Sequence, residues 1–80
     1  RRAKTIEEAR TVLMDARRRF PKEAIIHFNL ACYECRLGNP DASIRHLKTA
    51  FQLNPQCREM AAEDEDLEPI WPLLEGLSSD

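Results

Sequence analysis

The fold of this chain is decided at Leu37-Gly38-Asn39-Pro40-Asp41, and a similar signal returns at Asn54-Pro55. Glycine readily adopts the left-handed conformation that ends a helix. Asparagine is a preferred N-cap residue, and proline fits the first helical position because no N–H is needed there. Both stretches therefore predict that one helix ends and the next begins within a few residues.

On both sides of these breaks, apolar residues recur every three or four positions, which is typical of amphipathic helices. Thr5 and Glu8 have the spacing of a capping box, so we expect the first helix to begin at Thr5. Its apolar stripe comprises Ile6, Ala9, Leu13, Ala16 and Phe20. Because a residue before proline avoids the helical region, Phe20 is expected to end this helix. Pro21 is then expected in the first turn of the second helix.

The remaining helices are expected at 22–37, 39–53 and from Cys57 into the acidic residues 63–66. The second of the chain's helices is apolar around much of its circumference, so it should be packed on two sides. Residues 67–76 are apolar but interrupted by two prolines, which predicts one or two helical turns.

The chain has 80 residues, of which 42% are hydrophobic and 32% charged. This length allows one domain, residues 1–80, with a single core. With only two glycines and five prolines, the chain is neither collagen-like nor of low complexity. Runs of alternating β-branched residues are absent and Ala, Leu, Arg and Glu dominate, which predicts an all-α domain. No apolar stretch approaches the ~20 residues that span a bilayer, and no secretory signal is evident. We therefore expect no membrane partner and a cytoplasmic location.

Four pairs of residues repeat at one separation of 34 positions. The pairs are Ala9 and Ser43, Leu13 and Leu47, Ala16 and Ala50, and Pro21 and Pro55. This is the period of the tetratricopeptide repeat, a helix–turn–helix unit. With Asn29-Leu30-Ala31-Cys32-Tyr33 and Leu37-Gly38-Asn39 at matching places, the chain resembles the tetratricopeptide repeat family.

The resemblance implies an antiparallel helix–turn–helix bundle with a right-handed superhelical twist and about four to five helices. Residues 5–21 would form the second helix of a partial repeat, 22–55 a complete repeat, 56–76 capping helices and 77–80 a tail. The family's usual Trp, Gly, Tyr, Ala and Phe are replaced here by His27, Ala31, Glu34, Ser43 and Leu47. The small residues Ala31, Ser43 and Ala50 would still allow the helices to approach closely where they cross.

A C-terminal cap is expected because residues 56–76 do not continue the repeat. Each repeat leaves an apolar face open, so one and a half repeats need a cover to form a stable domain. We expect Trp71, Ile70 and Leu74 to provide that cover. The residues they should cover are Leu47, Phe51 and Met60.

Five residues of the second helix share spacings of three or four and hence one face. They are Ile25, Phe28, Asn29, Cys32 and Arg36. In the tetratricopeptide repeat family, such first helices line a concave groove that receives an extended peptide or a partner helix. The resemblance therefore implies a non-enzymatic interaction module for a protein or peptide partner, with Asn29 holding backbone amides of the ligand. Arg36 could pair with a carboxylate, and ordinary packing of Ile25 and Phe28 is the alternative interpretation.

Cys32, Cys35 and Cys57 form a second candidate site. A redox dithiol usually lies at a helix N-terminus, whereas Cys32 and Cys35 are expected in the middle of a helix. Zinc would need four ligands, and adding His27 and His46 gives no zinc-site spacing. We therefore expect these thiols to pack as small apolar side chains, without a metal. A thiol or metal switch through the three cysteines stays open as an alternative function.

No combination of residues in the sequence predicts catalysis. The only glycines are Gly38 and Gly76, so there is no phosphate-binding loop, and no Ser or Cys has an evident His–carboxylate pair. His27 is expected to be a satisfied interior histidine. The acidic residues 63–66 lack the pattern of a calcium loop and are expected to be a solvated N-cap region. We expect neither an enzyme nor a cofactor.

Charge is distributed unevenly along the chain. Residues 1–22 carry eight bases and three acids, whereas residues 59–80 carry eight acids and no base. Phe20 is the only aromatic residue of the basic end, so we expect no nucleic-acid partner. The two ends could stack head to tail, and the exposed edge of the first helix could meet a second copy. The same edge would suit the C-terminal structural end of a longer tetratricopeptide solenoid.

Overall fold

The structure, a computed structural model, describes residues 2–74 and 76, with side chains from Ile6 onward. The elements of this part of the chain are α1 (Arg2–Arg19), α2 (Ala24–Arg36), α3 (Pro40–Leu53), α4 (Cys57–Glu63), the 3₁₀ helix η1 (Glu65–Ile70) and α5 (Trp71–Leu74). Because all of them are helical, the predicted all-α class is confirmed. The expected tail, residues 77–80, lies outside the described residues. None of the described helices has both the length and the apolar character needed to cross a membrane.

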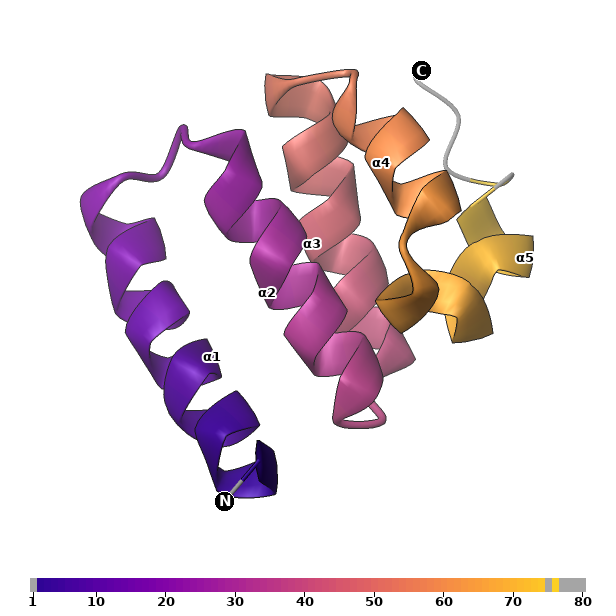
Figure 1. Ribbon diagram of the computed structural model, residues 1–80. Helices are drawn as coiled ribbons and strands as arrows, with labels where there is room; N and C mark the ends of the chain where they lie inside the picture. The colour runs from indigo at the N-terminus through magenta and orange to yellow at the C-terminus, as the bar shows by residue number, and fades with distance from the viewer. Residues whose placement is uncertain (1, 75, 77–80) are drawn as a thin grey trace.

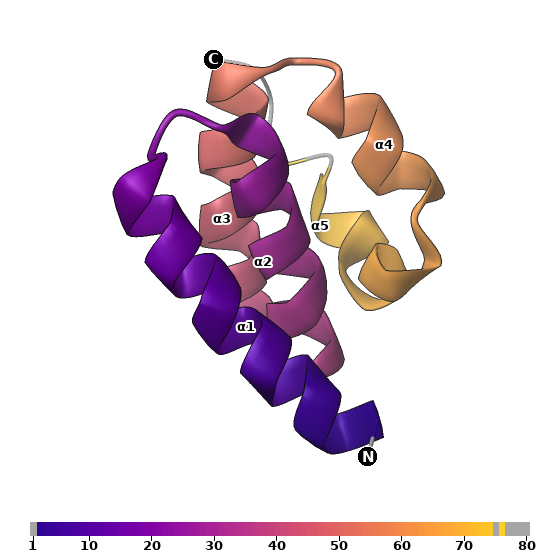
Figure 2. The ribbon, with the colours of Figure 1, turned by 60° about the vertical axis from the view of Figure 1, so that its left-hand side comes forward.

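The first three helices lie side by side in antiparallel order, with α2 between α1 and α3 (Figure 1). α2 makes its most extensive contact with α3 and a smaller one with α1. η1 also packs against α2, while α4 contacts both α2 and α3 (Figure 2). α2 is therefore the central helix of the bundle, as its wide apolar surface predicts.

The predicted break at Gly38 is confirmed. Gly38 has a φ of +85°, in the left-handed region, and Pro40 takes the first position of α3. Asn39 occupies the N-cap position, but its side chain accepts no backbone hydrogen bond there. Instead its Nδ2 donates to Oε1 of Glu34 over 2.8 Å. Asn39 thus connects the start of α3 to the end of α2.

The predicted start of the first helix at Thr5 is wrong, because α1 begins at Arg2. Ala3 and Lys4 both favour helix, so the helix extends beyond the capping-box pattern at Thr5 and Glu8. The predicted capping interaction of Thr5 rests on a side chain outside the described ones.

The prediction that the second helix begins at residues 21–22 is also wrong. α1 ends at Arg19, directly before Phe20 and Pro21, as the rule for residues before proline predicts. Pro21, however, lies in a turn, and α2 begins only at Ala24. Three further residues are used to reverse the chain so that α2 can return alongside α1.

The core lies between α2, α3 and the C-terminal segment. Its buried members are Phe28, Ala31, Cys32, Cys35, Leu47, Ala50, Cys57, Ala61, Leu67, Ile70 and Leu74. The small residues predicted at the helix crossing are buried there: Ser43 of α3 is fully buried, and its hydroxyl donates to the carbonyl of Ala31 in α2 over 2.7 Å. Larger side chains at these two positions would force the helices apart.

The C-terminal segment closes one side of the core, as predicted. Leu67, Ile70 and Leu74 are exposed by only 0%, 1% and 7%. Trp71 packs against the same cluster, and its Nε1 donates to the carbonyl of Ala61 over 2.9 Å. Met60, which we expected beneath this cap, is instead 40% exposed. It points outward because α4 turns Cys57 and Ala61 toward the core.

Candidate functional site

The predicted partner-binding face lies on α2, and three of its residues are accessible from outside. Ile25, Asn29 and Arg36 follow one another after four and seven residues, so they lie along one side of the helix. Ile25 is 46% exposed, the Arg36 side chain is 44% exposed, and Asn29 is half-buried. Among the residues that the structure describes, the Asn29 amide has no hydrogen-bond partner. We call these three residues the α2 strip.

The other two residues predicted for this face, Phe28 and Cys32, are buried in the core. Only 4% of Phe28 and 6% of Cys32 is exposed. Both belong to the side of α2 that packs against the rest of the core cluster, which includes residues of η1. A partner on the α2 strip cannot touch them, because both are buried in the folded chain. Of the five residues predicted for partner binding, three are therefore accessible to a partner.

The C-terminal segment meets α2 through its acidic beginning. Asp64 is the N-cap of η1, and one of its carboxylate oxygens accepts from the N–H of Asp66 over 2.9 Å. The N-cap role predicted for the acidic run is thus confirmed at Asp64. Its other carboxylate oxygen accepts from Sγ of Cys32 over 3.6 Å. Nε of Arg36 lies 3.9 Å from Oδ1 of Asp66, so the guanidinium of the strip already neighbours a carboxylate of its own chain.

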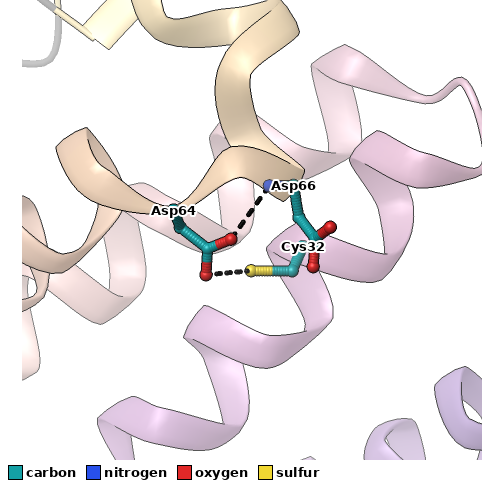
Figure 3. A group of neighbouring side chains, drawn as sticks. All are labelled: Cys32, Asp64 and Asp66. Atoms are coloured by element: carbon teal, nitrogen blue, oxygen red, sulfur yellow. Dashed lines mark hydrogen bonds between the residues drawn. The ribbon is translucent and has the colours of Figure 1, made fainter.

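Cys32, Asp64 and Asp66 form a cluster where η1 contacts α2 (Figure 3). One ligand atom from each residue lies within 4.8 Å of the other two. Burial and, after it, the negative charge of Asp64 raise the pKa of the Cys32 thiol far above its ordinary value. The thiol is therefore protonated at neutral pH. A divalent cation could be held here if it displaced that proton, because sulfur and carboxylate oxygen are both zinc ligands.

Cys35 and Cys57 lie outside this cluster. Both are buried, and burial raises the pKa of each thiol. All three cysteines are free, and all three belong to the core cluster, so the prediction that they pack as small apolar side chains is confirmed. The three cysteines are not brought together as ligands among the described residues, whereas Cys32 is brought to two carboxylates that the sequence pattern did not connect with it.

The two histidines make no hydrogen bond to a hydroxyl or thiol of the described residues. His27 is buried, and its Nε2 lies 2.8 Å from the carbonyl oxygen of Pro21, which makes it the satisfied interior histidine that we expected. His46 is half-buried in α3. Burial and, after it, the positive charge of Arg17 lower the pKa of His46. The described hydroxyl groups that form hydrogen bonds donate to backbone carbonyls.

Glu34 is a buried carboxylate that the sequence patterns did not single out. Only 6% of it is exposed, and its Oε1 accepts from Nδ2 of Asn39 over 2.8 Å and from Nη1 of Arg10 over 3.4 Å. It therefore links α1, α2 and the start of α3. The signal available in the sequence was an acid inside an apolar helix, because a buried charge requires partners.

No family model matches this chain, and the comparisons with curated proteins and with solved structures find no match either. Antiparallel helices joined by short turns occur in many unrelated α folds. The function of the chain must therefore be inferred from the chemistry of its own side chains.

Proposed function

We propose that this chain is a non-enzymatic, cytoplasmic protein-interaction module that binds an extended peptide along the α2 strip. The observation that carries the proposal is the Asn29 amide, which has no partner among the described residues and lies on one side of α2 with exposed Ile25 and Arg36. Three free thiols are in keeping with a reducing compartment. The resemblance to tetratricopeptide repeats supports the same side of the same helix.

Each residue of the strip supplies a different contact. The Asn29 amide can donate to a carbonyl and accept from an N–H, so it can pair with one peptide unit. Arg36 can hold a carboxylate through two parallel hydrogen bonds. Its present contact with Asp66 is exposed and long, and such a pair is weak enough to be exchanged for a carboxylate of the ligand. Ile25 can bury an aliphatic side chain.

The spacing of the strip defines the peptide. Arg36 follows Ile25 by eleven helical positions, a rise of roughly 16 Å. An extended chain covers that length in about five residues. The preferred ligand therefore carries an aliphatic and an acidic side chain about five positions apart, with the peptide unit that pairs with Asn29 between them.

Selection from a random peptide library, with counter-selection against Arg36→Ala, tests the proposal. We expect enriched peptides to show the aliphatic–acidic spacing and to shift the amide resonances of residues 25–36. Arg45→Ala is the matched control, since Arg45 is an exposed arginine on α3. Peptides that bind Arg36→Ala as tightly as the unaltered chain, or that shift resonances elsewhere, would contradict the proposal.

A metal-dependent switch at Cys32, Asp64 and Asp66 is the second candidate function, favoured by the convergence of their three ligand atoms. Binding of a cation such as Zn²⁺ would release the thiol proton and fasten η1 to α2. Co²⁺ serves as the probe, because a cobalt–thiolate bond absorbs by charge transfer. We expect this absorption in the unaltered chain and in Cys35→Ser but not in Cys32→Ser. No absorption in the unaltered chain, or equal absorption in Cys32→Ser, would exclude the site.

A further inference from the structure

Phe20 projects from a basic corner at the end of α1. It was expected in the apolar stripe of its helix, yet it is 55% exposed. Residues 17–22 contain three arginines and one lysine and no acid. The side chains of Arg18 and Arg19 are 77% and 72% exposed, and both contact Asp15 through exposed ion pairs that are individually weak. This corner therefore presents an aromatic side chain surrounded by positive charge.

A hollow with an acidic lining lies where α4 meets η1. It is open and shallow, and its lining residues are Met60, Glu63, Asp64, Glu65 and Asp66. Met60 is 40% exposed within this acidic rim. The sequence has no basic residue from 59 to 80. Among the described side chains, the ion pair that reaches this rim is the one between Arg36 and Asp66. The hollow is suited to an apolar group that carries positive charge on its flanks.

The basic corner and the acidic hollow lie on opposite sides of the molecule. The turn between α1 and α2 is far from α4 and η1 in both views (Figures 1 and 2). Phe20 of one molecule therefore cannot reach the hollow of the same molecule. The hollow adjoins the α2 strip at Arg36, which contacts Asp66 of the acidic rim, whereas Ile25 and Asn29 do not line the hollow.

We propose that the acidic hollow receives the basic corner of a second copy of this chain, with Phe20 placed against Met60. A thioether and an aromatic ring attract one another, and the opposite charges around them would orient the two molecules. Because the two surfaces are different, each contact leaves one corner and one hollow free. Because the corner and the hollow lie on opposite sides of the molecule, two copies cannot make both contacts with each other at once. The contact is thus heterologous, and copies add head to tail rather than closing as a symmetric dimer.

Two double variants of the 80-residue chain isolate the surfaces. The corner variant carries Phe20→Ser and Lys22→Glu, and the hollow variant carries Glu63→Lys and Glu65→Lys. Sedimentation equilibrium at low salt should show a mass that rises with concentration for the unaltered chain. Each double variant alone should be monomeric, with a dissociation constant raised at least about tenfold, equivalent to 1.4 kcal/mol. Lys48→Glu, an exposed change on α3, should associate like the unaltered chain.

Mixing the two variants gives the decisive result. The corner variant keeps an intact hollow and the hollow variant keeps an intact corner, so an equimolar mixture should form a 1:1 complex that grows no further. High salt should disperse this complex, because exposed charges are screened over about 3 Å at 1 M ionic strength. Thermal melts of both variants establish that each is folded. A monomeric unaltered chain, a monomeric mixture, or variants that associate as well as the unaltered chain would each overturn the proposal. A monomeric chain whose hollow binds a separate basic peptide would overturn it as well, because the occupant would then be another protein.

Discussion

Replacing Leu67 with alanine tests whether the C-terminal segment belongs to the folded unit. Leu67 is fully buried in η1, where it packs in the core cluster beside α2. Truncating a buried leucine to alanine costs about 2–5 kcal/mol, because the lost transfer free energy adds to that of the cavity. A chain of this length has an unfolding free energy of roughly 4–12 kcal/mol. The substitution should therefore remove a large share of the stability.

Denaturant unfolding, followed by Trp71 fluorescence and by far-ultraviolet circular dichroism, measures this effect. We expect both signals to change together at a clearly lower midpoint with an unchanged slope. Glu68→Ala, at the exposed neighbouring position, should stay within about 0.5 kcal/mol of the unaltered chain. If Leu67→Ala were equally mild, or if the Trp71 signal changed before the helical signal, residues 64–74 would not be part of the cooperative core.

Three further outcomes follow from other contacts. Ser43→Ala should lower the unfolding free energy by about 0.5–1.5 kcal/mol, since it removes a buried hydrogen bond, whereas Thr49→Ala at a less buried hydroxyl should change it little in the same denaturation assay. The lowered pKa of His46 means that its contribution to stability is complete above about pH 6.5 and is lost as the pH falls below that value, because the unfolded chain binds the proton more readily. His46→Gln should flatten that part of the curve of stability against pH, and an unchanged slope would contradict this. In a variant that lacks Cys35 and Cys57, the Cys32 thiol should react with a disulfide reagent only after unfolding. The reason is that burial and the charge of Asp64 raise the pKa of this thiol. Rapid labelling of the folded chain would refute this.

Helix ends were predictable where a single residue dominates the local backbone preference. Gly38 and Pro40 set the break between α2 and α3, and Pro21 set the end of α1. The start of α1 was not predictable in this way, because the capping-box pattern favours Thr5 while Ala3 and Lys4 before it also favour helix. Nor did the pattern show that the chain needs a full turn before Ala24 to reverse its direction.

The open face of α2 was predictable only in part. Helical spacing places Ile25, Asn29 and Arg36 on one side, and the structure leaves that side accessible. The same spacing could not show that Cys32 is covered, because the residue that contacts it, Asp64, is 32 positions away in the chain. No local periodicity encodes such a contact. It depends on how η1 packs once the core around Leu67 has formed.

The claim that α2 carries a peptide-binding strip is tested most directly by Asn29→Ala, with thermal stability and peptide affinity measured on the same variant. The Asn29 amide has no partner among the described residues, so the melting temperature should stay within about 2–4 °C of the unaltered chain, which is the shift that 0.5 kcal/mol produces. Affinity for a selected peptide should fall by about two- to tenfold, the loss of one hydrogen bond. A lower melting temperature with unchanged affinity would contradict the account, because Asn29 would then support the fold and not the ligand.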